Sequence, residues 1–187
     1  MKGCLVAGGL AVLVAVLVGL MLMGMYNGIV AKDEACKKAW GNVESVLQRR
    51  FDLIPNLVNT VKGYAAHEKG LLEEVTRLRS QWGEAQTPEA KAGVASMLEG
   101  ALGRLMVVVE NYPELKANQN FIALQDELAG TENRISVERQ RFNETVQTYN
   151  TAVRQMPTAL LARIAGFQPR APFEAAPAAG EAPKVEF

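Results

Sequence analysis

The most constraining feature of this chain is the segment from Leu5 to Met25, LVAGGLAVLVAVLVGLMLMGM, which contains no charged residue. An α-helix rises ~1.5 Å per residue, so about 20 apolar residues are needed to cross the ~30 Å hydrocarbon core of a bilayer. The segment meets that length. We therefore predict a membrane anchor helix that occupies residues 1–25. Its lipid-facing positions include Leu5, Leu10, Val14, Val18 and Met25.

The anchor does not resemble a cleavable secretory signal. Such a signal has an apolar region of roughly 7–15 residues followed by a site of small residues. The string Met23-Gly24-Met25 fits such a site poorly, and Tyr26 suits a membrane interface. Lys2 precedes the segment, whereas three lysines follow it before Trp40. Counting basic residues favours a cytoplasmic soluble domain, and export of that domain stays open as the alternative.

Beyond the anchor, apolar side chains recur three or four residues apart, as in amphipathic helices. The first helix can continue the anchor as far as Leu47. Arg49, Arg50, Asp52 and Pro55 then suit a helix junction, because arginines stabilise the end of one helix and an aspartate can cap the next. A kinked continuous helix is the alternative there. Three further helices are expected, over residues 57–82, 88–112 and 114–156, and a short piece over 158–165.

Thr87 and Pro88 fit the start of the third helix, and Gly130-Thr131 is the expected interruption of the fourth. Short connections make neighbouring helices antiparallel. The predicted fold class is therefore all-α. It consists of a transmembrane helix, an elongated antiparallel bundle with coiled-coil packing over residues 26–166, and an irregular tail rich in proline and alanine over residues 167–187.

The sequence offers no recognisable active site. His67 is the only histidine, and Leu71 stands where a zinc-protease motif would need the second histidine. A pair formed by His67 and Cys36 would lack an oxyanion site. We find neither a glycine-rich phosphate loop nor a cluster with metal spacing, so we predict no enzyme activity, no cofactor and no metal. Twenty basic residues balance twenty acidic ones, which argues against nucleic acid as a partner.

Four charged residues fall on the apolar stripes of the expected helices: Asp33, Glu68, Glu132 and Arg139. Buried charges are costly unless they are paired. These positions either face water or form an ionic seam that fixes the helix register. In the second case, we hypothesise that Arg139 pairs with Asp33 or Glu68.

The tail carries a second candidate site. Val185 and Phe187 alternate with Glu186, and a terminal carboxylate follows, which a groove at a sheet edge in a partner protein can bind. The alternative is that Phe173 and Phe187 dock on the bundle of this chain or of a neighbouring copy.

Blocks of sequence in a fixed order resemble one known family. The segment from Trp40 to Glu68, which contains QRRFDLIPN with Arg49, Arg50, Asp52, Pro55 and Asn56, is similar to its signature. NYPELKAN (111–118), GTENRI (130–135) and the ending APKVEF (182–187) resemble further blocks. Together they resemble the LemA family of bacterial membrane proteins. Phe51 and Phe142 stand where tyrosine is common in that family.

The resemblance implies a helical bundle behind one anchor in a bacterial envelope, with a short outer N-terminus and no catalytic residues. We therefore expect a single-pass protein of the bacterial cytoplasmic membrane, which contacts the lipid bilayer and forms a homo-oligomer. Identical subunits favour closed rings or cages. In this interpretation the chain is a self-associating scaffold. The alternative is a monomeric or dimeric adaptor that presents its tail to an envelope protein such as a protease.

Overall fold

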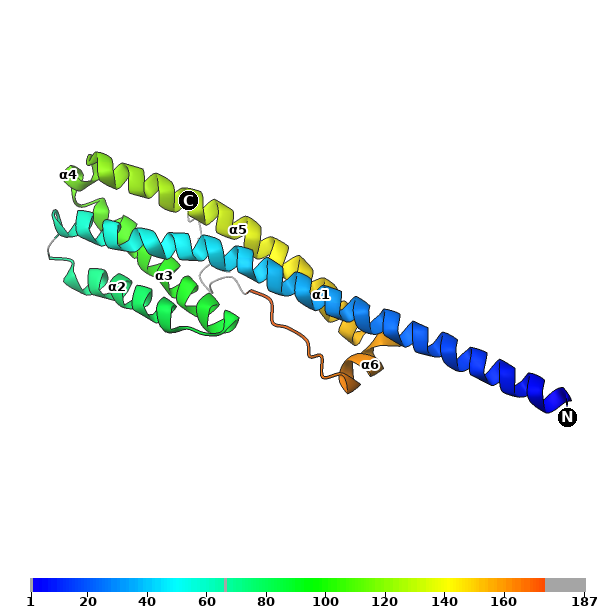
Figure 1. The fold of residues 1–187 in the computed structure, drawn as a ribbon. Coiled ribbons are helices and arrows are strands. Elements are labelled where there is room, and N and C mark those ends of the chain that lie inside the picture. Colours follow the sequence, from blue (N-terminus) through cyan, green and yellow to red (C-terminus); the bar gives the residue numbers. More distant parts are fainter. Residues whose placement is uncertain (1, 66, 174–187) are drawn as a thin grey trace, which may run out of the picture. The chain divides into compact units, whose positions relative to one another are not determined.

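The computed structural model describes residues 2–65 and 67–173, and their side chains from residue 8 onward. In these residues all regular secondary structure is helical (Figure 1), which confirms the all-α class. The helices are α1 (Lys2–Lys62), α2 (Lys69–Glu84), α3 (Pro88–Val109), α4 (Pro113–Lys116), α5 (Gln119–Arg154) and α6 (Thr158–Ile164).

The chain divides into two compact units, to each of which α1 and α5 contribute. The anchor unit comprises Met1–Ala39 and Phe142–Pro172, and the bundle unit comprises Trp40–Arg141 and Phe173–Phe187. The two units are described separately below.

Helix α1 runs without interruption through Pro55, so the predicted junction at Arg49–Pro55 is wrong and the continuous helix is correct. Proline inside a helix removes a hydrogen bond and costs roughly 3 kcal/mol. The apolar stripe nevertheless continues across it, since Phe51, Ile54, Leu57 and Val61 are all buried. Their packing outweighs the local cost. The helix ends at Lys62, and α2 begins at Lys69, later than predicted.

In the bundle unit, α2 runs antiparallel to α1, α3 antiparallel to α2, and α5 antiparallel to α3 (Figure 1). The ring of Phe51 on α1 stacks on Trp82 of α2, with centroids 4.5 Å apart and an interplanar angle of 14°. Trp82 Nε1 also donates a hydrogen bond of 2.7 Å to Gln48 Oε1. Arg104 of α3 contacts Glu74 of α2 at 2.6 Å. These contacts place the stacked aromatic pair in the core of the bundle.

Side-chain caps set two of the helix starts. Thr87 Oγ1 accepts a hydrogen bond from the Ala90 N–H at 3.2 Å, which confirms the predicted start of α3. Asn118 Oδ1 accepts from the N–H groups of Asn120 and Phe121, so α5 begins at Gln119 and not at Glu114 as predicted. Gly130-Thr131 does not interrupt α5, because Thr131 is buried and its hydroxyl donates to the Leu128 carbonyl.

In the anchor unit, the part of α1 that follows the apolar segment lies beside the last part of α5 and beside α6 (Figure 1). Ile29, Cys36, Val146, Tyr149 and Ala162 form its core. From Gly8 to Gly24 every residue is exposed, and this stretch is long and apolar enough to cross a membrane. Helix α3 passes the same test of length and composition, but Leu98, Ala101 and Leu105 of α3 are buried in the bundle unit.

Three of the predicted anchor positions are exposed in the structure, as residues that face lipid would be. Leu10, Val14 and Val18 are 62%, 51% and 49% exposed, so about half or more of the surface of each residue is uncovered. Met25 is half-buried, and the side chain of Leu5 lies outside the described part. Their contact with lipid stays a prediction.

Candidate functional site: a clamped strap and a basic groove

Residues 167–172, which we call the strap, follow α6 without regular secondary structure and bind to α5 within the anchor unit. Tyr149 Oη donates a hydrogen bond of 3.0 Å to the Gln168 carbonyl. Asn150 bonds the Arg170 backbone twice: its Nδ2 donates to the carbonyl and its Oδ1 accepts from the N–H, both at 2.8 Å. One amide side chain thus satisfies both polar groups of a backbone that has no helix or strand partner.

The guanidinium of Arg170 binds Asp33 on α1. Its Nε and Nη2 lie 3.0 and 2.8 Å from Asp33 Oδ1, and Lys37 Nζ lies 3.1 Å from Oδ2. The Asp33 side chain is only 14% exposed. This explains why a carboxylate stands on the apolar stripe of the first helix: it holds the strap.

These partners also set the pKa of the Asp33 carboxyl. Burial alone raises this pKa, but hydrogen bonds from Arg170 and Lys37 outweigh burial and lower it below its usual value. A carboxyl with a lowered pKa in the folded state stabilises the fold above the unfolded-state pKa, which is about 3.9. That contribution is lost as the pH falls through the folded-state value.

We therefore expect the stability of the wild-type chain to fall more steeply with acid than that of an Asp33→Asn variant, below about pH 4. The measurement is the urea midpoint of the full chain in detergent at a series of pH values. Asp126→Asn, at an exposed carboxylate on α5, is the matched control and should follow the wild type. Parallel curves for Asp33→Asn and wild type would contradict the assigned role of Asp33.

The charges of the predicted seam have other partners than those hypothesised. Arg139 contacts Glu99 at 3.2 Å, in place of Asp33 or Glu68. Glu68 accepts a hydrogen bond of 3.1 Å from Tyr112 Oη. Glu132 pairs with Arg50, whose residue is 7% exposed. Sequence reasoning placed Arg50 at a helix end and missed this part-buried pair, although Arg50 lies three residues after Leu47 of the apolar stripe.

Phe173 is the one predicted tail position that the structure describes, and it is buried in the bundle unit. Its ring lies 6.1 Å from that of Trp40, at an interplanar angle of 28°. The guanidinium carbon of Arg139 lies 4.4 Å from its centroid, in the geometry of a cation–π contact. Val185 and Phe187 lie outside the described residues, so their docking stays a prediction.

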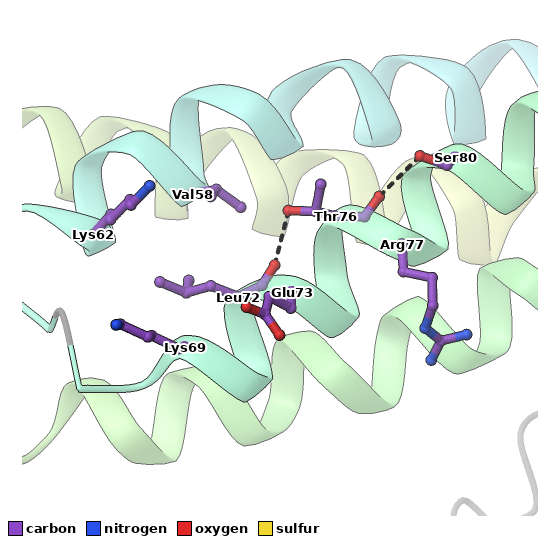
Figure 2. A pocket seen from close by; sticks show the side chains of 8 residues that line it. All are labelled: Val58, Lys62, Lys69, Leu72, Glu73, Thr76, Arg77 and Ser80. Carbon is purple, nitrogen blue, oxygen red and sulfur yellow. Dashed lines mark hydrogen bonds between the residues drawn. The ribbon is translucent and has the colours of Figure 1, made fainter.

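Sequence reasoning missed a groove in the bundle unit, between the end of α1 and α2 (Figure 2). Its volume is about 650 Å³. Lys62 and Lys69 lie towards one end and Arg77 towards the other. The residues that line the groove are Val58, Lys62, Lys69, Leu72, Glu73, Thr76, Arg77 and Ser80.

The groove combines positive charge with apolar surface. Three basic side chains and one carboxylate give a formal charge of 3 − 1 = +2, and Val58, which is half-buried, adds apolar contact surface above the buried Leu72. Among the described residues no ion pair joins the groove's basic side chains to an acid. Such a groove suits an acidic segment that also carries apolar side chains.

Cys36 and His67, the two residues considered for catalysis, belong to different units. Cys36 is fully buried in the anchor unit, and burial raises the pKa of its thiol, which disfavours the reactive thiolate. His67 is exposed in the turn between α1 and α2. In the described part of the chain no three His, Cys, Asp or Glu side chains are grouped to hold a metal ion.

Comparison with known proteins gives a consistent family relationship. The profile described as the LemA family matches residues 39–187. Magnetosome protein MamQ of Magnetospirillum gryphiswaldense is 29% identical over 190 residues, which cover 88% of this chain and 70% of that protein. Magnetosome protein MamQ 2 of Paramagnetospirillum magneticum is 28% identical with the same coverage. Protein LemA of Metamycoplasma hominis is 20% identical over 132 residues, which cover 70% of this chain and 60% of that protein.

Proposed function

The chain belongs to the LemA family, and from this premise we propose that it is a membrane-anchored helical scaffold whose copies bind one another through the tail and the basic groove. The exposed apolar stretch of α1 supports membrane association. We further propose that α1 spans the bacterial cytoplasmic membrane once, with the bundle unit on the cytoplasmic side. The lysines that follow the apolar segment support that orientation.

The observation that carries the proposal is the match between the groove and the tail. In the part of the tail that follows Phe173, residues 174–187, the side chains include three glutamates and one lysine, a formal charge of 1 − 3 = −2, whereas the groove has +2. Val185 and Phe187 provide apolar side chains for contact with Val58 and Leu72. A tail that binds the groove of a neighbouring copy makes a head-to-tail contact, which repeats until a ring closes or a filament forms.

The length of the tail is compatible with such a contact. Phe173 is packed against Trp40, which is 18 residues before Val58 along α1, or ~27 Å at ~1.5 Å per residue. The 14 residues after Phe173 span at most ~46 Å when extended. The part of the tail after Phe173 is therefore long enough to reach the groove of its own bundle. It can equally reach the groove of an adjacent copy that lies within ~46 Å of Phe173.

The test is the mass of the full-length protein in mild detergent, measured by light scattering. We expect a uniform particle of many copies, whose mass falls severalfold when the groove charges are reversed in Lys62→Glu/Lys69→Glu/Arg77→Glu. The matched control reverses three exposed basic residues of the bundle unit outside the groove, Arg79, Lys116 and Arg134, and should keep the wild-type mass.

A monomer or small dimer in the wild type would overturn the scaffold. That result would favour the adaptor, which presents its tail to an envelope protein. An unchanged large particle in the groove variant would retain self-association but would exclude the groove as its joint.

A further inference from the structure

Helix α6 and Met156, two residues before it, expose large apolar side chains on the surface of the anchor unit. Met156, Leu160 and Ile164 are 72%, 60% and 77% exposed. They are spaced four residues apart, and Leu160 and Ile164 lie on one side of α6. Ala162 of the same helix is 1% exposed and belongs to the core of the anchor unit. The helix is therefore held by one side and leaves an apolar surface on the other.

The position of α6 within the anchor unit indicates what covers this surface. The Phe167 N–H donates to the Ala162 carbonyl at 2.9 Å, and Gly166 makes the turn between them with a φ of 79°. The ring of Phe167 in turn lies 5.8 Å from that of Tyr26 on α1. Tyr26 directly follows the apolar segment. The end of α6 is thus fixed at the level where α1 would leave the hydrocarbon core (Figure 1).

We propose that α6 lies in the interface of the bilayer that α1 spans, with Leu160, Ile164 and Met156 inserted between the lipid headgroups. Tyr26, whose ring contacts Phe167, directly follows the membrane-facing part of α1, and a short amphipathic helix with basic residues binds such an interface. Arg154, two residues before Met156, and Arg163, next to Ile164 in α6, are exposed and would contact lipid phosphates. The inference rests on the proposed membrane span, and it holds for either topology.

An interfacial α6 would fix the anchor unit against the membrane at a second point beside α1. A single helix leaves a soluble domain free to tilt, whereas a second contact limits that motion. Because the strap begins directly after α6, the start of the tail would then be held at a defined height above the bilayer.

The test uses the full chain in lipid nanodiscs, with Cys4 and Cys36 replaced by alanine and one spin label at a time. Labels are placed at Leu160→Cys and Ile164→Cys, and the control label at Ala35→Cys. Ala35 is exposed on α1 and lies ~13 Å beyond Tyr26. Collision with oxygen, which concentrates in lipid, is compared with collision with a water-soluble nickel complex.

We expect the ratio of oxygen to nickel collision to be several-fold higher at residues 160 and 164 than at residue 35. The difference should grow when anionic phosphatidylglycerol is added to phosphatidylcholine. Equal ratios at all three positions would place α6 in water and overturn the inference. Low collision with both reagents would mean that another protein surface covers α6, and would overturn it too. A label at Leu17→Cys, in the apolar segment, reports separately whether α1 spans the bilayer. A low ratio of oxygen to nickel collision there would mean that the proposed membrane span fails, whereas a high ratio there with equal ratios at residues 160, 164 and 35 would mean that only the inference about α6 fails.

Discussion

Replacement of Phe51 by alanine lowers the free energy of unfolding by about 3–5 kcal/mol, as expected for loss of a fully buried aromatic side chain. Phe51 is 1% exposed and stacks on Trp82, which is itself 4% exposed. The variant loses both the buried area and the ring contact, and it leaves a cavity between α1 and α2.

The measurement is the guanidinium-induced unfolding of the full chain in mild detergent, followed by Trp fluorescence and by circular dichroism. Asn59→Ala, at an exposed position on the same helix, is the matched control and should change the stability by no more than about 0.5 kcal/mol. A loss below 1 kcal/mol for Phe51→Ala would mean that α1 and α2 do not share this core.

The helical architecture could be predicted from the sequence because apolar residues recur every three or four positions along most of the chain. Val43, Leu47, Leu57 and Val61 follow the three- and four-residue spacing of an amphipathic helix, and all are buried. The start of α3 was also predictable, because a cap of threonine followed by proline acts within one turn.

Helix boundaries near Pro55 and Gly130 were predicted wrongly, for a common reason. Proline and glycine lower the local preference for a helix, but tertiary packing decides whether the helix continues. The buried residues on both sides of Pro55 continue one stripe, and Thr131 is buried with its hydroxyl bonded inside α5. The helix propensity of single residues does not include such tertiary contacts, so it cannot predict that the helices continue.

The polar partners could not be predicted, because they come from distant parts of the sequence. Asp33 binds Arg170, which is 137 residues away, and no periodicity along one helix indicates such a pair. The groove likewise needs α1 and α2 to be placed side by side. Glu74 of α2 pairs with Arg104 of α3, and Arg77 of α2 lines the groove; the sequence of α2 alone indicates neither contact.

The proposed joint between copies predicts that a tail cysteine will cross-link to a groove cysteine of another chain. Thr76 lines the groove and is exposed, and Val185 belongs to the apolar end of the tail. A disulfide forms only when the two Cα atoms approach within about 7 Å, so it reports direct docking. Two chains are made, in both of which Cys4 and Cys36 are replaced by alanine. One carries Thr76→Cys and the other Val185→Cys, and each has its own affinity tag.

The most direct test is to co-express these two chains and to measure the mixed disulfide after mild oxidation. We expect a heterodimer that carries both tags to be the main product, and little product when Ser136→Cys, exposed on α5, replaces Thr76→Cys. Equal yields from Thr76→Cys and Ser136→Cys would contradict docking of the tail in the groove. A third variant carries Thr76→Cys and Val185→Cys in the same chain. If it forms only an internal disulfide and no cross-links to other chains, the tail binds its own bundle and the scaffold is contradicted.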